Sequence, residues 1–335
     1  MEKNLPEEWL TDLPLPSENI AFKPEEMIAC AKCGRKNPPN RLKCLYCGGE
    51  LEITESQSRF FKPNLRKLES WEKGFNVIFL PNADNFDEAK LSAAAGLLKL
   101  EAEAVKRLLA AADSLPLART ESEKEAEILR ARLEDFGLES LILSDETLAV
   151  EKPAQRLRGI EFFDDKLILI LFNRDEVVEI ASENLALLVS GAVFERKIEA
   201  TEKYNKKGEN KILDTSETAS DESLIDIYSR FDSIGYRIYA KGFDFSSLEA
   251  EKELLAKDNI KKLLNKLREF ASGAKFVDSY LQNRSNLTGI WEVEEKTDSR
   301  GLKREGFGKF NLENLTTVNN LAQFTKYSRL QWHLL

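Results

Sequence analysis

Four cysteines supply the clearest chemistry in this sequence, and all of them fall within eighteen residues. They are Cys30, Cys33, Cys44 and Cys47, and the chain has no others. Their spacing is C-x2-C-x10-C-x2-C. Each C-x2-C pair places two thiolates on one tight turn, and two such turns facing each other complete a tetrahedron of sulfur ligands. The sequence therefore predicts one structural Zn2+ held by these four cysteines.

Two alternatives to a structural zinc site are open from the residues alone. Two disulfides would require an oxidising compartment, yet residues 1–19 are acidic and contain prolines, unlike a secretory signal. A catalytic zinc usually keeps one position for water and often uses histidine, but the only histidine is His333. These observations favour a closed structural site in an intracellular, cytoplasmic protein.

The residues around the cysteines agree with two metal-binding turns. Gly34 and Gly48 each follow the second cysteine of a pair, where a left-handed backbone is needed. With Asn37 included, the spacing C-x2-C-x3-N-x6-C-x2-C resembles the zinc finger of the Ran-binding-protein-2 type, a short zinc ribbon. The sequence departs from that family at Ile28, where tryptophan is usual, and at Arg35, because Gly34-Arg35 replaces the Thr-Phe pair of ubiquitin-binding members. The resemblance implies zinc binding, and some members bind single-stranded RNA.

Basic side chains surround the cysteines, and one aromatic residue accompanies them. They are Lys32, Arg35, Lys36, Arg41, Lys43 and Tyr46, with no acidic residue between Cys30 and Cys47. Such a mixture could bind single-stranded RNA. It could also offset the charge of −2 on zinc with four thiolates. Because the whole chain has a net charge of −9, broad binding to phosphates or anionic membranes is disfavoured. We expect a protein partner, with RNA as the alternative and no membrane.

The middle of the chain follows an alternating strand and helix pattern. The expected elements, in the order strand, helix, helix, strand, helix, strand, are Phe75–Leu80, Phe86–Leu98, Glu101–Ala112, Ser114–Arg119, Thr120–Phe136 and Leu138–Leu143. Thr120 and Glu123 have the spacing of a capping box, and Gly137 is placed to end the helix that they begin.

This pattern resembles the C-terminal domain of the bacterial ribosomal stalk protein. The segments EAEAVKRLL and SEKEAEILRARLEDFGLESLIL carry the resemblance. That family binds its factors with a lysine-rich, glycine-containing helix pair. Here Glu101 and Glu103 occupy the region, so the resemblance implies the fold and not the ribosomal role.

The remainder of the chain predicts a larger α+β domain that begins with an antiparallel meander, comparable in shape with a small pleckstrin-homology barrel. The expected strands are 159–163, 166–172, 176–180, 185–198, 224–228, 236–243 and 289–294, and the expected helices are 259–270 and 320–330. Gly191 is placed as a bulge. Residues 204–223 are polar and predict a mobile surface loop, and 301–308 predict another loop.

The sequence as a whole predicts a multidomain α+β protein. Its expected parts are a flexible acidic lead (1–26), a zinc ribbon (27–53), a small α/β domain with the order βααβαβ (71–150) and the larger domain (156–335). Signals for catalysis are scarce, because no phosphate-binding glycine loop occurs and the thiols are committed to metal. We therefore expect a non-catalytic zinc-binding adaptor. The alternatives are an RNA- or ribosome-associated protein, or an enzyme with its site in the C-terminal domain.

Overall fold

The computed structural model describes residues 22–54, 61, 63, 65–69, 72–81, 87–111, 113–203, 211–306 and 309–335. It separates into two compact units, Met1–Pro63 and Asn64–Leu335. Most of the expected acidic lead, 1–21, and the expected start of the middle region at Trp71 lie outside the described residues.

The first unit contains a short antiparallel hairpin and a small core. Strand β1 (Ile28–Ala29) pairs with β2 (Lys36–Asn37), and an isolated bridge joins Lys43 to Glu50. Ile28 and Leu51 are buried beside Cys30 and Cys44. The hydrophobic core of this segment is small, so a metal site is its main source of folding free energy.

The elements of the middle region follow the expected order. They are β3 (Phe75–Phe79), α2 (Glu88–Leu98), α3 (Ala102–Ala110), β4 (Pro116–Thr120), α4 (Glu123–Asp135), β5 (Ser140–Ser144) and the short α5 (Asp145–Leu148). β3 lies between β4 and β5 in a three-stranded antiparallel sheet.

The expected start of α4 is wrong by two residues. Thr120 pairs with Phe75 as the last residue of β4, so it cannot cap the helix. Ser122 is the N-cap instead, and its hydroxyl accepts a hydrogen bond from the backbone N–H of Glu125. Gly137 ends the helix as expected, with a positive φ of 86°.

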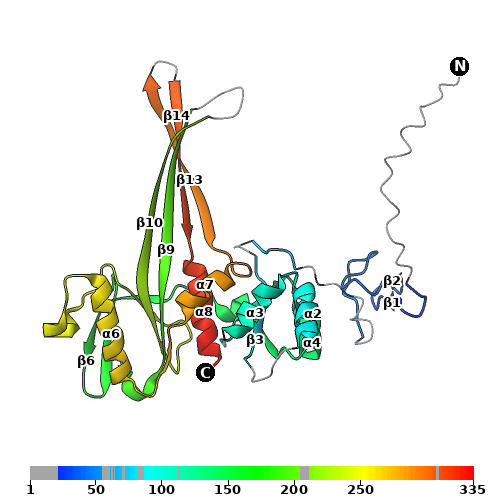
Figure 1. The fold of residues 1–335 in the computed structure, drawn as a ribbon, viewed down its shortest axis with the longest axis horizontal. Coiled ribbons are helices and arrows are strands. Elements are labelled where there is room, and N and C mark those ends of the chain that lie inside the picture. Colours follow the sequence, from blue (N-terminus) through cyan, green and yellow to red (C-terminus); the bar gives the residue numbers. More distant parts are fainter. Residues whose placement is uncertain are drawn as a thin grey trace. The chain divides into compact units, whose positions relative to one another are not determined.

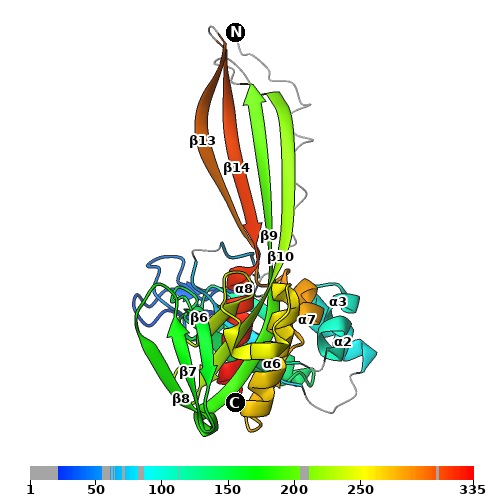
Figure 2. The same ribbon diagram turned by 90° about the vertical axis from the view of Figure 1, so that its left-hand side faces the viewer.

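A curled sheet forms most of the C-terminal part. Its strands hydrogen-bond in the order β13-β14-β9-β10-β11-β6-β7-β8, and β12 (Lys275–Val277) pairs with β9. The expected meander is present as β6 (Gln155–Phe162), β7 (Lys166–Leu171) and β8 (Val177–Ala181), followed later by β11 (Tyr236–Tyr239). This part of the sheet curls into a half-barrel, against which α6 (Ala256–Phe270) packs its apolar face (Figure 2).

Two further helices connect the half-barrel to the middle region. α7 (Tyr280–Leu287) and α8 (Leu321–His333) lie between them (Figure 1). Phe324, Tyr327 and Leu330 of α8 belong to the same buried cluster as Val77 and Leu129 of the middle region. Residues 71–150 and 156–335 are therefore parts of one unit with a common core.

Four long strands extend beyond the core as a projecting sheet, which we call the arm. They are β9 (Leu185–Lys203), β10 (Lys211–Ser229), β13 (Glu294–Gly306) and β14 (Lys309–Asn319). The arm comprises residues 194–203, 211–223, 294–306 and 309–319, and it projects from the rest of its unit in both ribbon views (Figures 1 and 2). At about 3.3 Å per residue, ten residues of β9 span about 33 Å.

The arm overturns three sequence expectations. Residues 211–223 are strand β10 rather than a mobile loop, while 204–210 lie outside the described residues. Residues 301–306 continue β13, with Gly301 at a register shift, and 307–308 are not described. Residues 289–293 precede β13 instead of forming a strand. These strands bury neither face, so their sequences lack the alternation that identifies a half-buried strand.

Gly191 does not form the expected bulge. It pairs with Leu224 in unbroken register, within the buried part of β9. A Cβ at this position would overlap the Phe324 ring of α8 and lie 3.0 Å from the Tyr280 ring. Glycine is needed here because an aromatic side chain packs directly on the backbone.

We predict that Gly191→Ala lowers the free energy of unfolding by about 1–3 kcal/mol, because the added methyl group overpacks the core. Urea denaturation measures this change. Gly96→Ala is the matched control: a Cβ in this helical position meets no atom within 4 Å, so the free energy of unfolding should rise by up to about 1 kcal/mol. Equal effects of the two substitutions would contradict the packing explanation.

Candidate functional site

The four predicted cysteines come together in the first unit. Their Sγ atoms all lie within 4.8 Å of one another. The Cys30–Cys47 and Cys33–Cys44 sulfur distances are both 3.6 Å. A disulfide would require about 2.05 Å, whereas tetrahedral zinc with bonds of about 2.3 Å separates its sulfur ligands by about 3.8 Å. The donor set and its spacing fit a four-thiolate metal site.

Two equivalent turns position the sulfur atoms. The backbone N–H of Gly34 donates to the carbonyl oxygen of Cys30 at 2.7 Å, and that of Gly48 donates to Cys44 at 3.0 Å. Gly34 and Gly48 have φ values of 69° and 68°. The left-handed glycine ends each turn, so both sulfurs of a pair face the same point.

Asn37 joins the two turns from a fully buried position. Its side-chain amide donates to Cys44 Sγ at 3.4 Å and to the carbonyl oxygen of Arg35 at 2.9 Å, and its Oδ1 accepts from the backbone N–H of Leu45. Burial raises the pKa of Cys44. Hydrogen bonds from the Tyr46 backbone and the Asn37 amide outweigh this effect and lower the pKa to about 6. Asn37 therefore supports the thiolate that a metal needs.

The basic residues of the ribbon are all exposed. They are Lys32, Arg35, Lys36, Arg41 and Lys43. The Arg35 guanidinium lies 4.7 Å from the centroid of the Tyr46 ring, so these two residues form one cation–π pair. Leu45 and Tyr46 are 52% and 56% exposed, which places a small apolar surface beside the second turn. The sequence gives no signal for Leu45, because one leucine in a loop forms no pattern.

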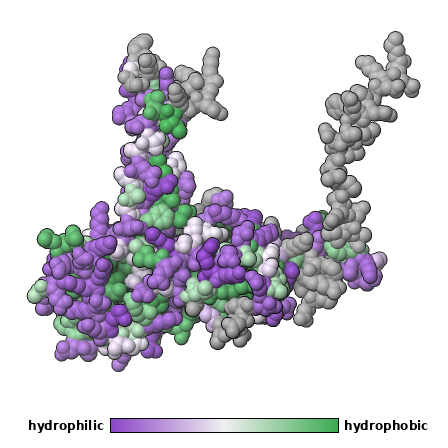
Figure 3. All heavy atoms as spheres, in the orientation of Figure 1, coloured by the Kyte–Doolittle hydropathy of each residue, from purple (hydrophilic) through white to green (hydrophobic). Residues whose placement is uncertain are grey.

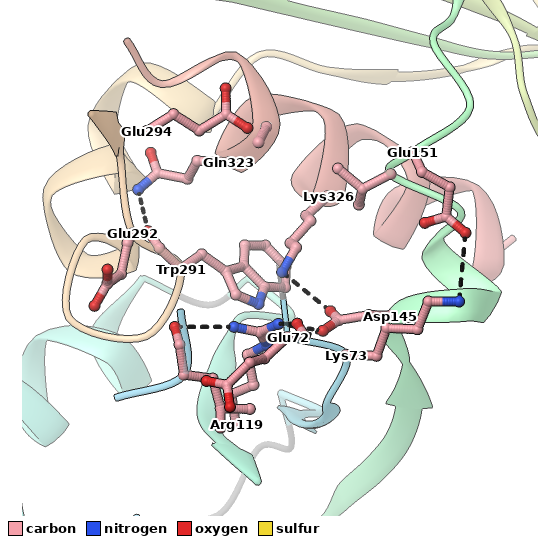
Figure 4. A pocket seen from close by; sticks show the side chains of 13 residues that line it. Glu72, Lys73, Arg119, Asp145, Glu151, Trp291, Glu292, Glu294, Gln323 and Lys326 are labelled. Atoms are coloured by element: carbon pink, nitrogen blue, oxygen red, sulfur yellow. Dashed lines mark hydrogen bonds and ion pairs between the residues drawn. The ribbon is translucent and has the colours of Figure 1, made fainter. Parts of the chain in front are cut away.

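A second candidate site is a cavity in the second unit, with a volume of about 490 Å3 (Figure 4). It lies between the middle region, the start of β13 with the residues before it, and α8. Its lining includes Glu72, Lys73, Arg119, Asp145, Glu151, Trp291, Glu292, Glu294, Gln323 and Lys326. The sequence gives no signal for this cavity, because its residues come from segments that lie far apart in the chain.

Asp145 forms the most connected group of the cavity. Its Oδ1 accepts from Asn76 and Lys326, both at 3.0 Å, and its Oδ2 accepts from the Gly74 backbone at 2.8 Å and Arg119 Nε at 2.9 Å. Burial raises its pKa, but the charges and hydrogen bonds of Lys326, Asn76 and Arg119 outweigh this and hold the pKa below its usual value. A carboxylate with four partners is suited to positioning rather than to proton transfer.

Lys326 is the group best placed to meet a ligand. Its side chain extends from α8 toward Asp145 and is 12% exposed. Burial lowers its pKa, and Asp145 offsets only part of that effect. An ammonium group has three donors, so Lys326 can contact an anionic group while it keeps its bond to Asp145. Glu151 and Glu294 at the rim could bind a cationic group, and the cavity therefore suits a small charged molecule.

We predict that Cys30→Ser plus Cys44→Ser abolishes zinc binding and unfolds the ribbon alone, because metal binding supplies its folding free energy. Metal content by mass spectrometry and limited proteolysis measure the two effects. Arg35→Ala plus Arg41→Ala is the control and should keep its zinc. Loss of cooperative unfolding in residues 64–335 would contradict the prediction.

We also predict that Asp145→Asn destabilises the second unit at pH 7 by about 3 kcal/mol, because Arg119 and Lys326 lose a buried partner. The folded-state pKa of Asp145 is lowered, so its contribution is present above about pH 4 and is lost as pH falls further. The difference between the variant and the unmodified protein in urea denaturation should therefore shrink toward pH 3. Glu146→Gln, an exposed neighbour, should change little at either pH. A difference that stays constant with pH would argue against the ionic role.

No model of a protein family, no curated protein and no solved structure matches this chain. The resemblances to the Ran-binding-protein-2 finger and to the stalk-protein domain therefore stay predictions. Within the part of the chain that the structure describes, no helix combines the length and apolar character needed to cross a bilayer.

Proposed function

We propose that this protein is a non-catalytic adaptor that binds zinc in its ribbon and contacts a protein partner through the ribbon and the arm. The arm is the observation that carries the proposal. Most of its side chains are exposed or half-buried on both faces of the sheet. Ordering such long strands costs conformational entropy that little core burial offsets. A surface of this kind is most easily explained if a partner uses it.

The free end of the arm adds an apolar surface, which we call the tip. It consists of Ile212, Leu213, Leu302 and Phe310, which are 61%, 48%, 53% and 41% exposed. Figure 3 shows hydrophobic residues near this end of the arm. Apolar side chains gathered at an exposed end are typical of an interaction site.

The ribbon supports the same role. A closed four-thiolate site leaves no ligand position for substrate, so zinc would act there through structure. Leu45 and Tyr46 offer a partner an apolar contact, and the exposed cations around them could orient it.

RNA binding is the second candidate, and the Arg35–Tyr46 pair favours it, since a guanidinium on an aromatic ring can extend a base stack. A third candidate is an enzyme that uses the cavity around Lys326. Asp145 itself is not free to act there as a general base, because its hydrogen bonding is saturated.

We predict that affinity capture from native lysate with the intact protein recovers a protein partner. Ile212→Ser plus Leu302→Ser should reduce its recovery by about tenfold, because the tip loses buried apolar contact. Leu254→Ser plus Leu255→Ser removes two exposed leucines outside the arm and should leave recovery unchanged. Quantitative mass spectrometry and RNA sequencing of the same eluates provide the readout.

Two other results would count against the adaptor. RNA recovered in a salt-sensitive manner, and lost with Arg35→Ala plus Arg41→Ala, would favour the second candidate. Recovery of no macromolecule by any form would turn attention to the cavity.

A further inference from the structure

The two edges of the arm differ in how they are protected. The strand order β13-β14-β9-β10 places β13 at one edge of the arm and β10 at the other. β11 pairs with β10 only from Leu224 to Ile227, and the Ser223 carbonyl accepts from Ala240. Among the described residues, Asp214–Glu222 therefore has a neighbouring strand on one side only.

The β13 edge carries several features that block pairing with another chain. Lys296, Arg300 and Lys303 are exposed along it. A register shift between Ser299 and Gly301 distorts its middle. Charged side chains, lysine above all, and bulges are the devices by which proteins prevent edge-to-edge association. β13 is thus an edge built to remain unpaired.

Between Asp214 and Glu222 the β10 edge has no bulge, and all of its charged side chains are acidic. This segment reads DTSETASDE and contains no lysine, arginine or proline. A register shift with β9 lies between Ile212 and Asp214, but the register is unbroken from Asp214 to Tyr228, so the outward backbone groups of the segment are evenly spaced. The segment has nine residues and is mostly exposed, which gives a regular edge about 30 Å long.

The charges on this edge have one sign. Asp214, Glu217, Asp221 and Glu222 are its only ionisable side chains. Arg196 Nε of β9 lies 3.6 Å from Glu217 Oε1, and Arg284 Nη1 of α7 lies 3.4 Å from Asp221 Oδ1. These two arginines offset part of the negative charge. A chain that paired with β10 from outside would meet Asp214 and Glu222 on one face of the sheet and Glu217 and Asp221 on the other.

We propose that the β10 edge, Asp214–Glu222, binds an extended basic segment of a partner protein as an added strand. Backbone hydrogen bonds would supply the pairing, and lysine or arginine at alternate positions would face the carboxylates on one surface of the sheet. The inference rests on the adaptor role and assigns it a surface and a class of partner. A second copy of this chain fits less well, because β10 would meet an equally acidic β10 or the protected β13.

The test uses the full-length protein and a peptide of about ten residues that alternates valine and lysine, with blocked ends. Fluorescence anisotropy should show binding, and hydrogen exchange should show new protection confined to residues 214–222. Thr218→Lys plus Ser220→Lys supplies the lysines that the edge lacks, and it should weaken binding about tenfold or more. Asn314→Lys plus Thr317→Lys adds the same charge to the inner strand β14 and should weaken binding far less.

Two control peptides separate strand addition from simple charge attraction. A valine–glutamate peptide should not bind. A valine–lysine peptide with N-methyl groups on alternate amides keeps its charge but loses one set of backbone donors, so it should bind at least about tenfold more weakly. Equal binding of the N-methylated peptide, or protection outside residues 214–222, would overturn the proposal. Protection of this edge that rises with protein concentration alone would overturn it in favour of a second copy.

The two proposals fail in different ways. If the peptide does not bind while lysate capture still recovers a partner through the tip, the edge inference is wrong and the adaptor role stands. If the peptide protects β10 but capture recovers no protein, the edge can bind an added strand and the adaptor role is wrong.

Discussion

The second unit depends on a buried row of hydrogen bonds that joins segments from its whole length. Trp291 Nε1 donates to Asn76 Oδ1 at 2.7 Å, and the Trp291 carbonyl accepts from Gln323 at 2.8 Å. Tyr280 donates to Gln323 at 2.9 Å, and Asn320 donates to Tyr280 at 2.8 Å. Each partner is buried, so the loss of one leaves another polar group without water or protein contact. Because the row ends where Asn320 accepts from the Phe194 backbone, it also fixes the base of the arm.

The middle region and the ribbon could be predicted from the sequence more readily than the arm, because their signals are local. β3 is a short continuous run of buried, mostly apolar residues, and α4 buries apolar residues at helical spacing, so the sequence pattern identifies both. The cysteine spacing places four thiolates at one point without any knowledge of the rest of the chain. In β10, by contrast, a run of serine, threonine and acidic residues forms a strand because β9 pairs with it. The local sequence of β10 does not indicate this partner strand. The cavity around Asp145 could not be predicted for the same reason, since Arg119 and Lys326 come close to each other only in the folded chain.

The ribbon and the arm present two kinds of surface for one proposed role. The ribbon offers a few exposed side chains on a turn held by metal, where zinc would replace a core that so short a segment cannot build. The arm offers backbone hydrogen-bonding groups along one edge and apolar side chains at its tip. Binding of an extended segment and binding of a folded surface use these features separately, so their contributions to a partner can be measured one at a time.

The arm consists of two hairpins, β9–β10 and β13–β14, joined along a single seam between β9 and β14. Each hairpin connects strands that are close neighbours in sequence, whereas the seam pairs Glu195 with Asn319. Closing that long loop carries the larger entropic cost, so the hairpins can form early and the seam closes only after the core has brought their bases together. The seam between β9 and β14 is therefore the last part of the arm to form during folding and the first to open on unfolding.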